Sequence, residues 1–201
     1  GLKWRGKYID NGILSNLTQL SSPIIWRGQM FDNVEAAYVA EKNPFVIVDG
    51  VPFIDYVAAW CRKNGSYGVK TLGIPKSRGG LIDARPDWDI TRISVMLSLQ
   101  ALKYAPGRSE ALWLKQQRPE YLVEHNNWHD RFWGAVMNKD QTISRGRDIL
   151  GELVKIIQEC NNKDTPMWVI PESSWVTTQA YIVNKIIERR AQRRLNGGGL
   201  S

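Results

Sequence analysis

Residues 85–104 read RPDWDITRISVMLSLQALKY and have the clearest helical pattern in the chain. Pro86 suits the first turn of a helix, and Asp87 and Asp89 place negative charge at the positive end of the helix dipole. Apolar side chains then recur at helical spacing, at Ile93, Met96, Leu97 and Tyr104. The sequence therefore predicts a long helix over this segment.

Further helices are expected on both sides of it. Asp32-Asn33-Val34-Glu35 has the pattern of a capping box, and no helix breaker follows until Pro44, which predicts a helix of about three turns. Periodicity and end signals predict four more helices, over residues 53–63, 108–117, 147–160 and 173–195.

Strand signals are short and few. The apolar runs that turn residues flank are 24–26, 45–48, 121–123 and 167–170. They are too few for a large sheet, so the expected fold class is mainly α, multihelical, with a few short peripheral β-strands; α+β is the alternative description. Residues 44–80 are rich in glycine and are expected to form a long irregular segment over one face of the molecule. Long loops of this kind often line functional sites.

Composition indicates a globular protein. The 201 residues, 43% of them hydrophobic, suffice to bury a core without disulfide bonds or structural metals. Cys61 and Cys160 form no CxxC pair, which favours two reduced thiols and a cytoplasmic protein. No apolar run approaches the roughly 20 residues that span a bilayer, and the first residues lack the apolar stretch of a signal peptide. We therefore expect neither secretion nor a membrane partner.

Residues 1–160 are expected to form one domain, and residues 161–201 a C-terminal extension with a basic amphipathic helix. The net charge of the chain is +7. Basic side chains cluster in the extension, at Lys185, Arg189, Arg190, Arg193 and Arg194. Such a cluster favours salt-dependent association with phosphate polyanions and predicts a nucleic-acid-binding surface. The alternative is a solvated helix end that complements the helix dipole.

Glu35 and Lys42 are seven positions apart in one expected helix, so both project from the same side of it. An acid and an amine on one stripe can protonate a leaving group and offer a nucleophile to the same substrate, with each pKa set by burial and by the other group. In the structural alternative, Glu35 is the reciprocal cap of Asp32, and Lys42 is an exposed helix end.

Residues 122–134 read LVEHNNWHDRFWG, the densest group of polar and aromatic side chains in the sequence. Trp128 and Trp133 are candidates to sandwich a base or heterocycle. Asp130 and His129 are candidates to orient or deprotonate a water molecule or a ribose hydroxyl. In the alternative, the tryptophans belong to the core.

Zinc is not expected at this segment. His125 and His129 lie four positions apart, as metal-binding histidines on a helix do. No Glu lies between them, the chain has no further His, and the intervening Asn pair favours a turn, so no metal site is predicted.

Residues 144–151 read SRGRDILG and join a basic glycine turn to the start of an expected helix. The backbone amides of this turn, with Arg145 and Arg147, are candidates to hold phosphate. The spacing matches neither a Walker loop nor a dinucleotide fingerprint, so nucleoside triphosphate chemistry is not predicted.

Six blocks of sequence between Gly12 and Glu159 resemble, in the same order, the YbiA-like or NADAR family of N-glycosidases. One block matches the family's E-H-x-x-Q-x-x-K helix at Glu35 and Lys42. The six blocks are 14–17, 24–27, 34–42, 85–88 with 95–96, 122–124 with 130–134, and 146–151.

The resemblance implies hydrolysis of a bond between ribose C1 and a nitrogen atom, in an ADP-ribosylated base such as guanine in DNA or in a ribosylamino intermediate of riboflavin synthesis. Lys42 would be the covalent nucleophile, Glu35 the acid or base, Asp130 the carboxylate that orients the ribose, and Trp133 the stacking wall. Further substrate contacts are expected from Asn16, Trp88, Trp128, Phe132, Gly134, Arg145, Arg147 and Asp148. No metal or cofactor is implied.

The chain departs from the family's pattern at four positions. His is replaced by Ala36, Gln by Val39, Phe by Leu17 and Asn by Asp148. Asp148 would repel a phosphate unless a neighbouring arginine offsets its charge.

Two functions follow as hypotheses. The basic extension favours an N-glycosidase that acts on a nucleotide or nucleic-acid substrate, with DNA as a candidate partner. The alternative is a catalytically impaired module of the same fold that recognises nucleic acid or ADP-ribose through Trp128, Trp133 and the Arg-rich segments.

Overall fold

The structure, a computed structural model, describes residues 14–65, 68–126, 129–137 and 143–195 and is mainly helical. The helices in these ranges are α1 (Val34–Glu41), α2 (Phe53–Asn64), α3 (Val69–Leu72), α4 (Trp88–Lys103), α5 (Ser109–Lys115), α6 (Ile149–Asn162) and α7 (Trp175–Leu195). The strands form the antiparallel hairpins β1 (Ile24–Trp26) with β2 (Gln29–Phe31) and β3 (Ile47–Val48) with β4 (Val51–Pro52), and one sheet of β5 (His125–Asn126), β6 (Ala135–Met137) and β7 (Ile143–Gly146). The predicted class, mainly α with short peripheral strands, is confirmed.

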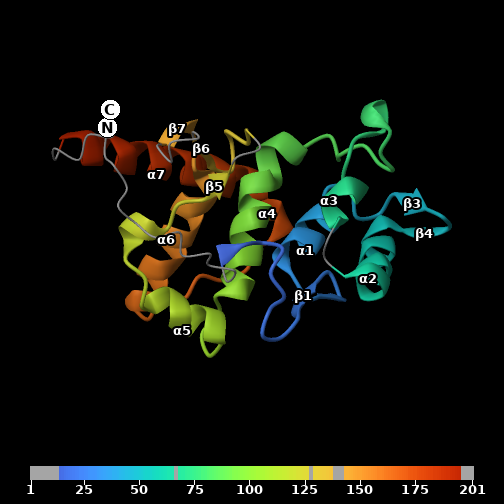
Figure 1. Ribbon diagram of the computed structural model, residues 1–201, viewed down its shortest axis with the longest axis horizontal. Helices are drawn as coiled ribbons and strands as arrows, with labels where there is room; N and C mark the ends of the chain where they lie inside the picture. The colour runs from blue at the N-terminus through green and yellow to red at the C-terminus, as the bar shows by residue number, and fades with distance from the viewer. Residues whose placement is uncertain (1–13, 66–67, 127–128, 138–142, 196–201) are drawn as a thin grey trace.

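Helix α4 stands at the centre of the molecule (Figure 1). It contacts α1 on one side, α6 on the other, and α7 along its length. Nearly every side chain from Thr91 to Lys103 is buried, because the helix is covered on several faces rather than on one stripe. The helix predicted over residues 85–104 is confirmed, as are the helices that became α1, α2, α5, α6 and α7.

Helix α7 is part of the core rather than a detached tail. Its Trp175, Ile182 and Ile186 are at most 3% exposed. The Gln179 side chain accepts a hydrogen bond from the Ile93 backbone N–H at 2.8 Å and donates to the Asp89 carbonyl at 2.8 Å. Helix α7 thereby binds a backbone donor and a backbone acceptor in the first turns of α4. The predicted division at residue 160 stays a prediction.

Two of the four predicted strands form and two do not. Residues 24–26 are β1 and residues 47–48 are β3. Residue 121 instead ends the 3₁₀ turn η3 (Pro119–Tyr121), and neither 122–123 nor 167–170 is a strand. Residues 44–80 are more regular than expected, because they contain the β3–β4 hairpin, α2 and α3. Strands of two to four residues are too short to show a period in the sequence, so tertiary pairing decides them.

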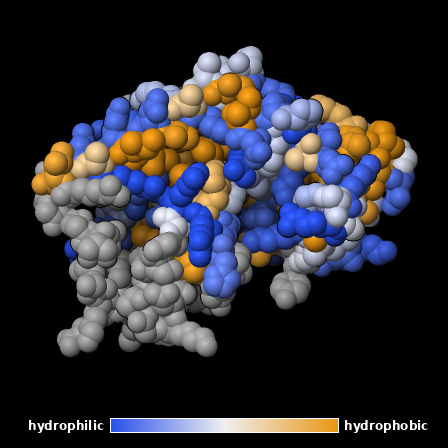
Figure 2. Space-filling view, turned by 90° about the horizontal axis from the view of Figure 1, so that it is seen from above, coloured by the Kyte–Doolittle hydropathy of each residue, from blue (hydrophilic) through white to orange (hydrophobic). Residues whose placement is uncertain are grey.

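Apolar side chains remain on the outer faces of both hairpins. Ile25 and Met30 are cross-strand neighbours, and with Phe45 and Ile47 they are 61–66% exposed. Figure 2 shows hydrophobic surface at the end of the molecule that carries β3 and β4. The hairpins therefore cover the helical core with one face only.

Within the described ranges, no helix combines the length and hydrophobicity needed to cross a bilayer.

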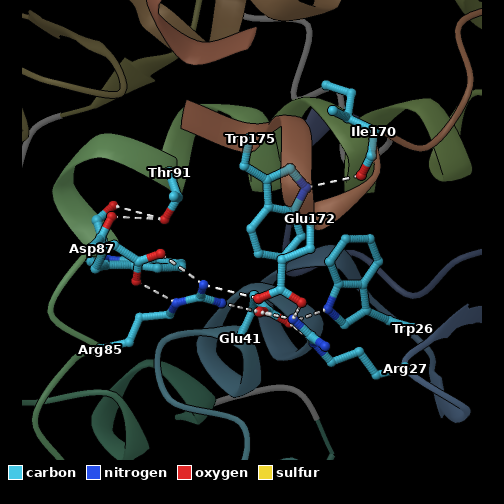
Figure 3. Close-up of polar contacts among 10 residues, drawn as sticks. Trp26, Arg27, Glu41, Arg85, Asp87, Thr91, Ile170, Glu172 and Trp175 are labelled. Carbon is cyan, nitrogen blue, oxygen red and sulfur yellow. Dashed lines mark hydrogen bonds and ion pairs between the residues drawn. The ribbon is translucent and has the colours of Figure 1, made fainter. Parts of the chain in front are cut away.

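The carboxylate of Glu41, at the end of α1, is fully buried and joins four parts of the chain (Figure 3). It accepts hydrogen bonds from the Trp26 indole at 2.7 Å, from Arg27 at 2.6 and 2.9 Å, and from Arg85 at 3.0 Å. Glu172, just before α7, forms ion pairs with the same two arginines at 2.7 and 2.9 Å. This Glu41 cluster fixes the β1–β2 hairpin, α1, the start of α4 and the start of α7 against one another.

We predict that Glu41→Gln lowers the free energy of unfolding by about 3–5 kcal/mol, because it removes the fully buried charge that Arg27 and Arg85 share and leaves these half-buried guanidinium groups only the more exposed Glu172 and Asp87. Urea denaturation followed by circular dichroism measures the loss. Glu188→Gln, at an exposed position of α7, is the matched control and should change stability by less than about 0.5 kcal/mol. Equal stability of the two variants would contradict the central role of the cluster.

Candidate active site

Helix α1 begins one residue later than the sequence suggested. Its N-cap is Asn33, whose side chain accepts the Ala36 backbone N–H at 2.8 Å, so the predicted pairing of Asp32 with Glu35 is wrong. The backbone N–H of Glu35 donates instead to the Asn16 carbonyl at 2.9 Å. Asn33 and Asp32 are both good caps, and tertiary contacts select between them. The Glu35 carboxyl is therefore not needed to start the helix.

Burial shifts Glu35 and Lys42 toward their uncharged forms. Burial raises the pKa of Glu35, and the charge of Asp130 raises it further, while Lys70 and Lys42 oppose the shift. Burial lowers the pKa of Lys42, Glu35 opposes this, and Arg78, Lys70 and Arg92 lower it again. A protonated acid and a neutral amine, each within the field of the other, are the forms that proton donation and nucleophilic attack require.

Lys42 is half-buried and lies against the end of α3. Its Nζ donates to the Gly73 carbonyl at 3.0 Å. A Cβ at Gly73 would lie 2.9 Å from this Nζ and 3.2 Å from the Val39 side chain. The exposed helix end of the structural alternative is therefore wrong for Lys42, and a side chain at position 73 would displace its amine.

An aromatic cluster lies beside the acid and the amine. The ring of Tyr38, one turn after Glu35, packs 5.0 Å from Trp88 and 5.6 Å from Trp133 between ring centroids. Phe132 meets Trp133 edge-on at 4.9 Å. Trp88 and Tyr38 are buried, whereas Trp133 and Phe132 are half-buried. Packing thus explains Trp88, and Trp133 and Phe132 are better placed to meet a ligand.

Asp130 holds the turn that carries these rings. Its Oδ1 accepts the backbone N–H groups of Phe132 and Trp133, both at 2.9 Å. Because its charge raises the pKa values of both Glu35 and Tyr38, the carboxylate lies close to the face of α1 that carries them. Glu35 is therefore within the electrostatic reach of Lys42, from its own helix, and of Asp130, from a separate part of the sequence.

The glycine turn before α6 does not offer the amides predicted for phosphate. The backbone N–H groups of residues 147–150 donate to the carbonyls of residues 131–134, at 2.8 to 3.4 Å. Glycine is needed at position 146 for this contact, because a Cβ there would lie 2.2 Å from the Gly134 carbonyl oxygen. The predicted phosphate contact through these amides is wrong, because the chain already uses them.

Glu124 and Asp148 form a second carboxyl pair, which the sequence did not single out. Asp148 Oδ1 accepts the Glu124 backbone N–H at 2.9 Å, and Asp148 adopts a left-handed backbone conformation with φ 41°. The pKa of each side chain is raised to about 7. Burial is the main cause for both, and for Glu124 the charge of Asp148 contributes as well. Gly151 lies against the Asp148 carboxyl, where a Cβ would be 2.5 Å away. Asp148 therefore faces the chain rather than a phosphate.

Other predicted contacts are spread over the molecule. Asn16 supports the site from behind, since Gln100 donates to its side chain at 2.6 Å and its carbonyl holds Glu35. Arg189 forms ion pairs with Glu159 and Glu152 of α6. Lys185 is exposed, and Arg190 lies near enough to Asp148 to lower its pKa. Trp128 lies outside the described residues, as do the side chains of Arg145, Arg193 and Arg194.

A cavity lies away from the candidate site. One cavity of about 320 Å³ lies between α5 and the end of α6, lined in part by Leu112, Lys115 and Asn161. Neither Glu35 nor Lys42 lines it. Both side chains are half-buried, so a substrate would reach them across the surface between α1, α3 and the 129–134 turn.

We predict that the free energy of unfolding falls as pH rises from about 4 to 7. In that window the folded chain keeps protons on Glu124 and Asp148 that the unfolded chain has lost, which limits the slope to about 1.4 kcal/mol per pH unit for each proton. Asp148→Asn should flatten the dependence of the free energy of unfolding on pH. It removes one titrating carboxyl, and it removes the charge that raises the pKa of Glu124. Asp49→Asn is the matched control, since Asp49 is exposed with φ 50°. Equal slopes in wild type and Asp148→Asn would refute the coupling.

Within the described residues, no group of three or more His, Cys, Asp and Glu side chains is arranged to hold a metal ion. Comparison of the chain with family models, with curated proteins and with solved structures finds no match. A function must therefore be argued from the chemistry and geometry of the residues themselves.

Proposed function

We propose that the protein is an N-glycosidase that hydrolyses a bond between ribose C1 and a nitrogen atom, in an ADP-ribosylated base such as guanine in DNA or in a related nucleotide adduct. The observation that carries the proposal is the placement of Glu35 and Lys42 on one side of α1, where burial favours the acid in its protonated form and the amine in its neutral form. The resemblance of the α1 sequence to the NADAR helix supports the same assignment.

Each group has a defined role in the first step. The C1–N bond breaks as protonated Glu35 gives its proton to the departing nitrogen, which keeps the bonding electron pair. The neutral Lys42 amine forms a new bond to C1, and its proton passes to the Glu35 carboxylate. The ribose ring then opens, its oxygen takes this proton, and a Schiff base remains on Lys42.

Water completes the reaction. It adds to the C=N bond of the Schiff base, and collapse of the adduct releases the sugar with oxygen at C1 and returns Lys42 as an amine. The net change is one water consumed for one C–N bond broken. The Asp130 carboxylate favours the positive charge that develops on the sugar, and the half-buried ring of Trp133 offers a stacking surface for the base.

Two departures from the family's pattern lie behind the site rather than in it. Ala36 is fully buried and Val39 is 1% exposed. Val39 packs next to Gly73 and therefore against the end of the Lys42 side chain. These substitutions change the packing that supports the amine and leave the acid and the amine in place.

We predict that Lys42→Ala and Glu35→Gln each reduce the release of ADP-ribose from guanine-modified DNA by at least about 100-fold, since each removes a group that forms or breaks a bond. Release is measured by chromatography of the free sugar nucleotide. Lys63→Ala and Glu188→Gln, at exposed positions, are matched controls and should keep wild-type rates.

Trapping with borohydride tests the covalent role of Lys42. Reduction during turnover should fix a sugar on wild-type protein and on the Lys63→Ala control, seen as a mass increase on the peptide that contains Lys42. Turnover retained in both Lys42→Ala and Glu35→Gln would overturn the assigned mechanism.

A further inference from the structure

The segment that contains α3 is attached directly to the end of α1 (Figure 1). The Nζ of Lys42 donates to the Gly73 carbonyl, the Arg85 backbone N–H donates to the Lys42 carbonyl at 2.7 Å, and the Asn43 side chain donates to the Asp83 carbonyl at 3.0 Å. The Gly73 N–H in turn bonds to the Lys70 carbonyl at 3.2 Å. Residues 70–85 are thus held beside the reactive amine by several hydrogen bonds.

A tight turn fixes the backbone of Arg78 in this segment. The 3₁₀ turn η2 (Lys76–Arg78) is closed by bonds from the N–H groups of Arg78 and Gly80 to the Pro75 carbonyl, at 2.9 and 3.0 Å. Gly80 packs so closely that a Cβ would lie 1.6 Å from the Ile74 carbonyl oxygen. The Arg78 side chain is exposed. Its backbone is therefore ordered while its guanidinium faces solvent.

Arg92 of α4 adds a cation from the opposite side. Its guanidinium lies 3.9 Å above the ring of Phe132, in the aromatic cluster of the site. One terminal nitrogen lies 3.5 Å from the exposed Asp89 carboxylate. Its Nε is buried and has no hydrogen-bond partner within the described part of the chain. A buried guanidinium donor of this kind is suited to an anionic ligand.

The charges around Lys42 are predominantly positive. Lys70, Arg78 and Arg92 each lower the pKa of Lys42, whereas the Glu35 carboxyl raises it. Three cations therefore act on the amine against one carboxyl, whose own pKa is raised by burial. An anion bound beside Lys42 would therefore be stabilised, and the amides of residues 147–150 are not available to hold it.

We propose that Lys70, Arg78 and Arg92 form a phosphate-binding rim that holds the phosphate or pyrophosphate carried by the ribose whose C1 reaches Lys42. This rests on the proposed function and deepens it, because it selects phosphorylated ribosyl adducts over plain ribosides. Arg78 and Arg92 offer paired N–H donors to phosphate oxygens, and Lys70 adds a mobile positive charge. The phosphate belongs to a free nucleotide or to a nucleic-acid backbone, and the two sources are separable by experiment.

The test measures binding rather than turnover, by titration calorimetry of the full chain with ADP-ribose, with ribose and with a short unmodified DNA duplex. In the variant Lys70→Gln with Arg78→Gln, the Kd for ADP-ribose should rise at least about tenfold, and the dependence of Kd on salt should become weaker. Ribose affinity should stay unchanged. The control, Arg62→Gln with Lys63→Gln, removes two exposed cations from α2 and should bind ADP-ribose as wild type does.

Arg92→Gln gives a second arm that leaves the α3 segment intact and should also raise the Kd for ADP-ribose. A weakening confined to ADP-ribose identifies a nucleotide phosphate, and a weakening confined to the duplex identifies the nucleic-acid backbone. Unchanged Kd values for both, or no binding of either to the wild-type chain at millimolar concentration, would overturn the rim. The proposed function fails separately, if rim variants weaken ADP-ribose binding while wild-type protein shows no turnover.

Discussion

The buried carboxylate of Glu41 is the constraint on which the arrangement of this protein depends. It lies at the end of α1, is fully buried, and its partners come from the β1–β2 hairpin and from the approach to α4. A buried charge is tolerated only when its partners stay in place, so these elements keep one relative position. Lys42, the next residue, is thereby presented from a rigid helix end, and Glu172 extends the same constraint to the start of α7.

Burial and neighbouring charge act together at the site. An acid and an amine side by side in water would both be charged; here the loss of solvent moves both toward neutrality, and the surrounding cations move the amine further. Glu124 and Asp148 show the same effect among carboxyls alone. The proposed cationic rim and the shifted pKa values of Glu35 and Lys42 therefore share one cause, the distribution of charge over a partly buried surface.

The sequence predicts the features that depend on local pattern. Helical period and end signals locate α4 and α7, and the seven-residue spacing places Glu35 and Lys42 on one side of α1. What it cannot predict depends on residues distant in the chain. In the sequence, Glu41 is one acidic residue of a helix, and only the fold brings Arg27 and Arg85 to it. The backbone amides of residues 147–150 could bind a phosphate by their sequence pattern, but in the fold they donate to the carbonyls of residues 131–134. Glu124 and Lys70 carry no local signal, because burial and neighbours give them their role.

The bond from the Ile93 N–H to Gln179 has a consequence for biosynthesis. The ribosome synthesises α4 well before residue 179. The amino-terminal turns of α4, and Arg27 and Arg85, which pair with Glu172, therefore stay uncovered while the intervening chain is made. Helix α7, which is made after α4, covers the amino-terminal turns of α4. A nascent chain halted in between would expose both a helix terminus and a charged seam, which is the kind of surface that chaperones retain.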